Sequence, residues 1–252
     1  MKLNIVPPRI GLQWVKLGIQ TFFKQPLALA GLFFIYMAAV IVVSQVPYLG
    51  VIIGGMLVPA ATLGLMAATA EATKGRFPMP SVLISAFRAG RQRMRAMLVL
   101  GVIYTAGSML ASSLGSLATG GPSAATHEID SATLLALALH TPLFVMFWHA
   151  PALVHWHGVS PGKSLFFSAV ACFRNFGAHL LYALAWLAVF LAVGSVFGLI
   201  GGLIGGATMA RAVMMPTALL MAAMFSTSIY FTFRDSFSAT PEPEQQVPGE
   251  PP

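Results

Sequence analysis

The chain has 252 residues, of which 57% are apolar and only 8% are charged. Soluble globular proteins are close to half apolar and about one quarter charged, so this composition excludes a water-soluble globular domain. The 14 Lys and Arg against 7 Asp and Glu give a net charge of +7, and the single cysteine, Cys172, excludes an intramolecular disulfide.

The charged residues are clustered and leave long uncharged segments between them. These segments cover residues 25–70, 96–127, 131–162, 175–210 and 212–233. A helix needs roughly 20 apolar residues to cross a bilayer, so each segment has room for a span. The first has room for two, and Pro47 indicates the break because proline ends one helix and can open the next. The sequence therefore predicts an all-α fold, a polytopic bundle of six transmembrane helices. The expected spans are about 26–45, 48–70, 96–117, 131–154, 178–203 and 212–233.

The distribution of Lys and Arg predicts the orientation of these spans. An even number of spans places both termini on the same side of the membrane. With the N-terminus inside, every basic residue except Arg211 lies in a cytoplasmic segment, where Lys and Arg accumulate. We therefore expect a multi-pass protein of a bacterial inner membrane with both termini in the cytoplasm.

A short basic amphipathic segment precedes each odd-numbered span and predicts a helix at the membrane interface. These segments cover residues 1–25, 78–95 and 161–176. Each even-numbered span contains a proline, at Pro59, Pro142 and Pro216. This pattern favours three copies of one unit, made of an interfacial helix and two spans. The alternative is that any two-span hairpin returning to a basic interface shows the same pattern.

The basic residues of the interfacial segments are candidate contacts for anionic lipid headgroups, which attract juxtamembrane Lys and Arg. The candidates are Lys16, Lys24, Arg88, Arg91, Arg95 and Arg174. Because the topology already accounts for these charges, we expect the lipid bilayer as partner and no nucleic acid. A homo-oligomer or a second membrane protein stays open as a further partner. Residues 239–252, rich in Pro and Glu, predict a disordered cytoplasmic tail.

Two stretches of the chain carry a resemblance to a known group of proteins. The first runs from Val6-Pro7-Pro8-Arg9 through Trp14, Gly18 and Phe22 to Lys24-Gln25-Pro26. The second comprises Ala150-Pro151-Ala152-Leu153, His157-Gly158, Pro161, Lys163-Ser164 and Cys172-Phe173-Arg174-Asn175. They resemble a group of uncharacterised proteobacterial multi-pass membrane proteins, which is distantly similar to the membrane domain attached to some glycerophosphoryl diester phosphodiesterases. The resemblance implies a membrane fold and no known chemistry, because the catalytic barrel of those enzymes is not expected here.

The expected spans contain no Asp, Glu, Lys or Arg, apart from Glu71 and Arg211 at span ends. Transporters coupled to protons or sodium usually keep such a residue inside the membrane, so this class is disfavoured. The sequence offers no catalytic constellation and no cofactor motif, and we expect neither an enzyme nor a cofactor. Cys172 is expected to be a buried or lipid-facing thiol, because no His/Asp arrangement beside it is evident in the sequence.

Histidine and glycine supply the remaining candidate site residues. His155, His157 and His179 are weak candidates for a metal site, although convergent ligands are not guaranteed by this spacing, and interfacial hydrogen bonding is the favoured interpretation. His140 and His149 lie nine residues apart on opposite faces of one helix and cannot share a ligand face. The small-xxx-small pairs predict close helix packing, and they are Gly194/Gly198 and Gly202/Gly206.

Three hypotheses for function follow. The first is a non-enzymatic integral inner-membrane protein that organises lipid or partner proteins. The alternative is a permease for a small neutral or amphipathic solute, with the proline-containing spans and the glycine-rich fifth span lining a path. The third is a metal or haem protein centred on His149, His155, His157 and His179.

Overall fold

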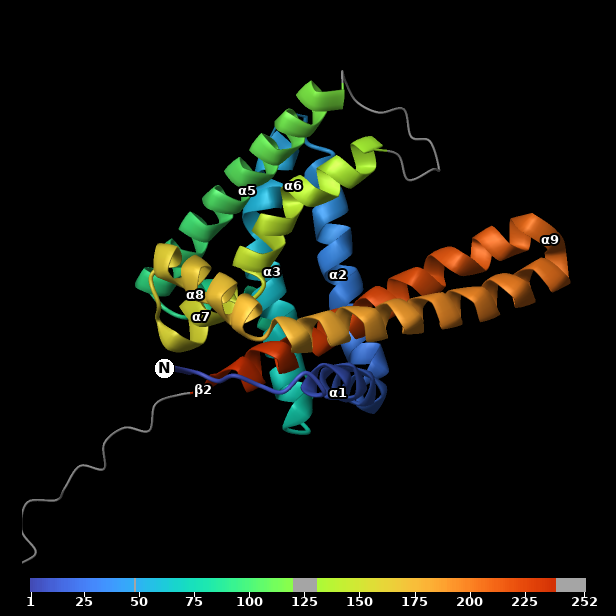
Figure 1. Ribbon diagram of the computed structural model, residues 1–252, viewed down its shortest axis with the longest axis horizontal. Coiled ribbons are helices and arrows are strands. Elements are labelled where there is room, and N and C mark those ends of the chain that lie inside the picture. The colour runs from blue at the N-terminus through green and yellow to red at the C-terminus, as the bar shows by residue number, and fades with distance from the viewer. Residues whose placement is uncertain (48, 120–130, 239–252) are drawn as a thin grey trace, which may run out of the picture.

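The computed structural model describes residues 1–47, 49–119 and 131–238, and helices make up nearly all of it (Figure 1). The α-helices are α1 (Ile10–Lys24), α2 (Pro26–Ser44), α3 (Leu49–Thr73), α4 (Ser85–Arg88), α5 (Arg91–Thr119), α6 (Ser131–Phe147), α7 (Ala150–His157), α8 (Pro161–Arg174) and α9 (Phe176–Ser236). A 3-10 helix, η1 (Pro80–Ile84), precedes α4. The strands β1 (Lys2–Leu3) and β2 (Phe237–Ser238) pair antiparallel and join the two ends of the described chain. The all-α class is confirmed, and the predicted tail 239–252 lies outside the described residues.

Several of these helices are long and apolar enough to cross a membrane. They are α2, α3, α5, the stretch Leu134–His157 that covers most of α6 and α7, and α9. Their outward surface is apolar as well: Leu27 is 89% exposed and Leu203 is 88% exposed. Exposed apolar area of this extent is unfavourable in water and is what lipid-facing helices present. The protein is therefore an integral membrane protein with multiple spans.

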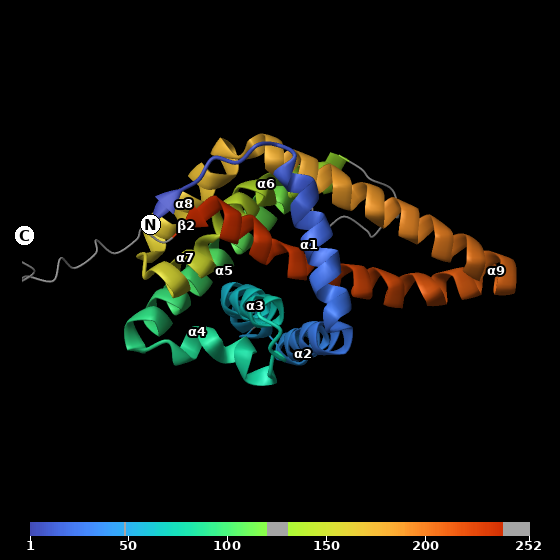
Figure 2. The ribbon, with the colours of Figure 1, turned by 90° about the horizontal axis from the view of Figure 1, so that it is seen from below.

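Helix α9 reverses direction at Gly205 and Gly206, where the backbone leaves the helical region and Gly206 has φ +65°. Only glycine adopts this conformation without steric cost. The two arms, 176–204 and 207–236, therefore form a hairpin whose tip projects beyond the other helices (Figures 1 and 2). The expected spans 178–203 and 212–233 fall one in each arm.

Two predicted helices are interrupted in the structure. Residues 78–95 do not form one interfacial helix: η1 and α4 are followed by Gly90 at φ +96°, and α5 begins at Arg91. The predicted span 131–154 is divided between α6 and α7. Its break lies just before Pro151, which has no N–H to donate to the carbonyl of Phe147 and whose ring would clash with it. By contrast, the prolines expected within spans lie inside α3, α6 and α9.

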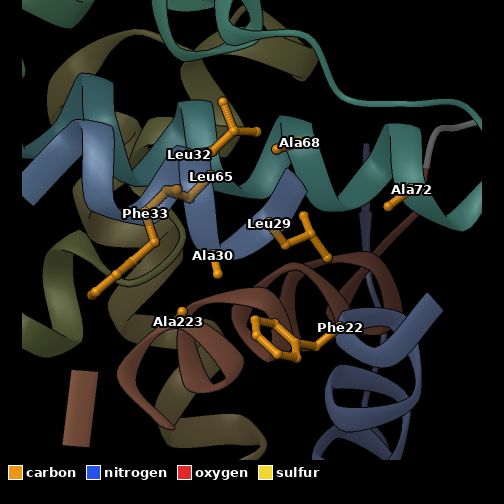
Figure 3. Close-up of a cluster of buried hydrophobic side chains, with 9 residues drawn as sticks. All are labelled: Phe22, Leu29, Ala30, Leu32, Phe33, Leu65, Ala68, Ala72 and Ala223. Carbon is orange, nitrogen blue, oxygen red and sulfur yellow. The ribbon is translucent and has the colours of Figure 1, made fainter. Parts of the chain in front are cut away.

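The core joins helices that are distant in sequence. Figure 3 shows one cluster in which Phe22 of α1 and Leu29 and Phe33 of α2 pack against Leu65 of α3 and Ala223 of α9. Further buried clusters join α3, α5, α6 and α7, and join α1 to both arms of α9. These contacts hold the ends of the long helices together, near α1 and the strand pair.

Helix α1 lies directly against α9. Gly11 and Gly18 share a face of α1 because they are seven residues apart, and Trp14 lies between them, fully buried. A Cβ at Gly11 would overlap the backbone of Ala178, and one at Gly18 would overlap Ser228. The Trp14 Nε1–H donates a hydrogen bond of 2.9 Å to Oδ2 of Asp235. The two helices therefore approach as closely as their backbones permit.

This contact predicts the effect of enlarging the α1 glycine. Gly11→Val should destabilise the protein by about 1–3 kcal/mol because the added carbons overlap α9 backbone, which cannot move aside cheaply. Thermal unfolding followed by circular dichroism in detergent measures the change. Gly31→Val in α2 is the matched control, since a Cβ there meets nothing within 4 Å. Equal melting temperatures for the two variants would contradict the close α1–α9 contact.

Candidate functional sites

The basic residues expected at lipid headgroups are all exposed in the structure. They are Lys16 and Lys24 on α1, Arg88 at the end of α4, Arg91 and Arg95 on the first turns of α5, and Arg174 at the end of α8. Because all six are exposed, their charges are available to an interfacial anion, and all except Lys16 lie at or near a helix end.

One small pocket gathers two of the arginines of this chain. It has a volume of about 380 Å³ and is formed by η1, α4, α5 and α7, with Arg88, Arg93 and His155 among its lining residues. The Ser85 Oγ and the His155 Nδ1 are buried there without a hydrogen-bond partner among the described residues. Buried polar atoms are nearly always hydrogen-bonded, so this pocket has unused capacity for a polar ligand. Two guanidinium groups beside it favour an anion. We call it the basic pocket.

Arg93 is a member of the basic pocket that helical periodicity does not select. Arg88 and Arg93 are five residues apart, which places them on different faces of any continuous helix. The turn at Gly90, with φ +96°, changes the direction of the chain between them and brings both to the same pocket. Gly90 was the feature of the sequence that could have indicated this turn, because glycine commonly ends a helix with positive φ.

A larger cleft lies between α6, α8 and the first arm of α9, with a volume of about 810 Å³. Its lining is mainly apolar and rich in aromatic side chains, which include Phe144, Trp148, Phe173, Phe176, Trp186 and Phe190. Apolar walls and this volume suit a hydrocarbon chain, because clefts of several hundred Å³ enclose ligands of that size. Cys172 and His179 also line the cleft and are its polar members beside Thr141 and Tyr182.

His149 lies at the break between α6 and α7, and Ser168 of α8 holds this break in place through hydrogen bonds. The Ser168 Oγ accepts a hydrogen bond from the His149 backbone N–H at 2.9 Å and donates one to the Val145 carbonyl at 2.9 Å. The His149 N–H and the Val145 carbonyl at the break therefore both have hydrogen-bond partners, as buried backbone groups require. The His149 side chain is fully buried on this side of the break.

His149 meets Cys172 of α8 and His179 of α9 in one cluster. The Cys172 Sγ lies 3.9 Å from the His149 Nδ1 and 4.0 Å from the His179 Nε2. All three atoms lie within 4.8 Å of one another. Two imidazole nitrogens and a sulfur are ligands that soft and borderline metal ions prefer. Burial raises the pKa of the Cys172 thiol from 9.0 to about 12, so the thiol is protonated at neutral pH.

The structure groups the histidines differently from the expected metal candidates. His179 lies with His149 and Cys172, whereas His155 faces the basic pocket and His157 stacks on Phe233 with ring centroids 5.8 Å apart. Sequence reasoning placed His149 and His179 together in the metal or haem hypothesis, but it missed Cys172 as a partner of His149 because the two belong to different elements. Their spacing of 23 residues matches no helical period.

The expected packing glycines of α9 have three different environments. A Cβ added at Gly194 or Gly198 would come into ordinary van der Waals contact with Met214 of the opposite arm. Gly202 faces open space and Gly206 forms the turn, so these two do not pack within the described chain. Gly201 takes the close-contact position instead, since a Cβ there would overlap Ala210. The turn at 205–206 shifts the contact by one residue.

The long apolar helices, their exposed apolar surface and these sites at helix ends define an all-α, multi-pass membrane protein. No protein-family profile matches the sequence, and no solved structure matches the chain. A curated protein of Burkholderia thailandensis, named a "probable inner membrane protein", is 37% identical over 268 aligned residues, which cover 100% of this chain and 97% of that protein. The chain belongs to the same family as this probable inner membrane protein.

The burial of Cys172 predicts slow alkylation. Because only the thiolate reacts, a pKa near 12 in place of 9.0 lowers the reactive fraction at pH 8 by about 1,000-fold. Metal-free protein in mild detergent should therefore label slowly with N-ethylmaleimide, with a rate that rises steadily from pH 8 to pH 11. Phe173→Cys in a Cys172→Ser background is the control, because Phe173 is exposed at the neighbouring position. Equal labelling rates would show that the thiol is not enclosed.

Proposed function

We propose that this inner-membrane protein is a non-enzymatic lipid-binding protein, which organises anionic phospholipid around itself. The observation that carries the proposal is the basic pocket, where Arg88 and Arg93 lie beside the unpartnered polar atoms of Ser85 and His155. A phosphate oxygen accepts hydrogen bonds from guanidinium, hydroxyl and imidazole N–H groups, so one headgroup phosphate would satisfy all of them. The other predicted contacts are exposed and would add weaker, salt-sensitive attraction.

A membrane lipid is a better match to the pocket than a free anion because of where the pocket lies. It is formed at the N-terminal end of α5, a helix long and apolar enough to cross a membrane. A headgroup bound there would leave its acyl chains beside the apolar sides of the helix, where Leu98 and Val102 are exposed. The larger aromatic cleft offers a second apolar surface of the same kind.

The proposed topology has six spans with both termini in the cytoplasm. The turn at Gly205 and Gly206 supports two spans within α9. The pairing of β1 with β2 brings the two ends of the described chain together, as an even number of spans requires. The basic residues at this end support its assignment to the cytoplasmic side.

A permease for a small neutral or amphipathic solute remains the alternative. The aromatic lining of the larger cleft is suited to acyl chains more than to a polar solute. The distant resemblance to the membrane domain of certain phosphodiesterases stays a prediction, and we propose no phosphodiester chemistry for this chain.

The topology predicts the outcome of reporter fusions. A fluorescent protein fused after Ser238 should fluoresce, because it folds in the cytoplasm. Alkaline phosphatase inserted within 120–130 should be active, because that segment would be periplasmic, and an insertion after Gly75 should be inactive. An active phosphatase after Gly75 would contradict the orientation.

Removing the charges of the basic pocket should weaken lipid binding. Arg88→Gln with Arg93→Gln is expected to lower the retention of phosphatidylglycerol roughly 10-fold or more, because hydrogen bonds to charged groups contribute about 1.5–3 kcal/mol each. Native mass spectrometry of the protein released from mixed micelles measures the retained lipid. Phosphatidylethanolamine and inorganic phosphate serve as further ligands, and retention of phosphate with equal affinity would indicate a free-anion site.

The matched control is Arg91→Gln with Arg95→Gln, which removes the same charge from the same region outside the pocket. This control should lose the salt-sensitive part of lipid association only. If both double variants lose phosphatidylglycerol equally, general electrostatic attraction explains the binding and the basic pocket is not a headgroup site.

A further inference from the structure

The cluster of His149, Cys172 and His179 is independent of the basic pocket and of the proposed lipid binding. Its residues come from the α6–α7 break, the last turn of α8 and the first turn of α9. Their ligand atoms lie within 4.8 Å of one another. Three different elements therefore bring their side chains to one point. The hydrogen bonds around the two imidazole rings determine which ring nitrogens carry a proton and which have a free lone pair.

His179 presents a nitrogen lone pair to the thiol. Its Nδ1 lies 3.1 Å from the backbone carbonyl of Asn175, and a carbonyl oxygen only accepts hydrogen bonds. The Nδ1 must therefore carry the proton of the neutral ring. The Nε2, 4.0 Å from the Cys172 Sγ, then has its lone pair free.

His149 presents a lone pair in the same way through Thr232. The Thr232 hydroxyl donates its single proton to the Ile229 carbonyl at 2.7 Å and accepts a hydrogen bond from the Trp148 Nε1–H at 3.0 Å. It can only accept from the His149 Nε2, 3.3 Å away, so that nitrogen carries the ring proton. The His149 Nδ1, 3.9 Å from the Cys172 Sγ, is left with its lone pair.

Both rings therefore direct lone pairs toward one sulfur, while their opposite nitrogens are held by hydrogen bonds. This is the arrangement of metal-ligating histidines, whose second ring nitrogen donates to a carbonyl or another acceptor. Metal bonds of about 2.3 Å to sulfur and about 2.0 Å to nitrogen, at about 120° to each other, place the sulfur and nitrogen about 3.7 Å apart. The observed sulfur–nitrogen separations of 3.9 and 4.0 Å need a contraction of a few tenths of an ångström. The two imidazole nitrogens, which lie within 4.8 Å of each other, must approach further, because the same bond lengths and angle place them about 3.5 Å apart.

We propose that His149, Cys172 and His179 form a binding site for a soft monovalent metal ion, Cu(I). On binding, the Cys172 S–H bond breaks, its proton passes to solvent, and the sulfur forms a bond to the ion without any change of oxidation state. One thiolate and Cu(I) make a neutral centre, whereas Zn(II) would leave a net positive charge. The surroundings favour the neutral centre, because they are apolar and aromatic, with the His149 ring against Phe233 and Phe237.

The site adjoins the large cleft on the side of Cys172 and His179, which both line it, whereas His149 is enclosed by protein. The three side chains supply a trigonal set, which satisfies Cu(I). A structural Zn(II) site needs a fourth ligand, and among the described residues the cluster holds three His, Cys, Asp or Glu side chains.

The test titrates the full-length protein in detergent with Cu(I) under anaerobic conditions, in competition with bicinchoninate. The wild-type protein should bind one equivalent and develop an ultraviolet thiolate-to-copper absorption. Cys172→Ser should lose the absorption and bind at least about 100-fold more weakly, and His140→Gln, which changes a histidine outside the cluster, should bind as the wild type does. Equal binding by wild type and Cys172→Ser would overturn the proposal and would assign the copper to methionines elsewhere.

Two further measurements separate a ligand role from a structural one. Thr232→Val removes the acceptor that fixes the His149 ring and should weaken Cu(I) binding about 10- to 100-fold. The metal-free melting temperatures of Cys172→Ser and the wild type should agree, and a value for Cys172→Ser several degrees lower would assign Cys172 a packing role. Stoichiometric retention of Zn(II) together with failure to bind Cu(I) would overturn the assignment of the ion.

Discussion

The close packing of α1 against α9 is the contact on which the remaining arrangement depends. Gly11 meets the backbone beside Ala178, so it determines where the first turn of α9 begins, and His179 follows at the next position. Trp14 completes this contact through its hydrogen bond to Asp235 and its edge contact with the His179 ring, at 5.2 Å between centroids. The first helix of the chain thus fixes both arms of the last one. The first arm of α9, held in this way, forms one wall of the cleft with α6 and α8.

The basic pocket and the cluster of His149, Cys172 and His179 lie where helices end, and the physical reason is the membrane. Inside a bilayer every backbone polar group must be paired, which confines irregular backbone and polar side chains to protected places near the ends of spans. Pro151 creates the break that frees His149, and Gly90 creates the turn that joins Arg88 to Arg93. Short interruptions of the helices therefore bring the polar side chains of the two sites together, while the spans themselves remain apolar.

Helix α7 connects the two sites. His149 precedes its first residue and belongs to the metal-ligand cluster, whereas His155 lies in its last turn and faces the basic pocket. Asn175 has a similar joining role at the α8–α9 junction, where its side chain holds the N-terminal segment by hydrogen bonds to the Val6 N–H and the Asn4 carbonyl. A few buried polar residues thus tie the N-terminal segment to the α8–α9 junction.

The sequence by itself determined the membrane class, the helix break near Pro47 and the exposure of the basic residues, because these depend on local composition and on a span's length. It also predicted a connection between the spans 178–203 and 212–233, although it assigned Gly202 and Gly206 to helix packing and not to a turn. Only the tertiary structure showed which residues come together in each site. Cys172 and His149 are far apart in sequence and share no helical period, so their meeting depends on how α8 packs under the α6–α7 break. Arg93 joined Arg88 only through a glycine turn. Periodicity describes one helix at a time, whereas each site combines atoms from three or more elements.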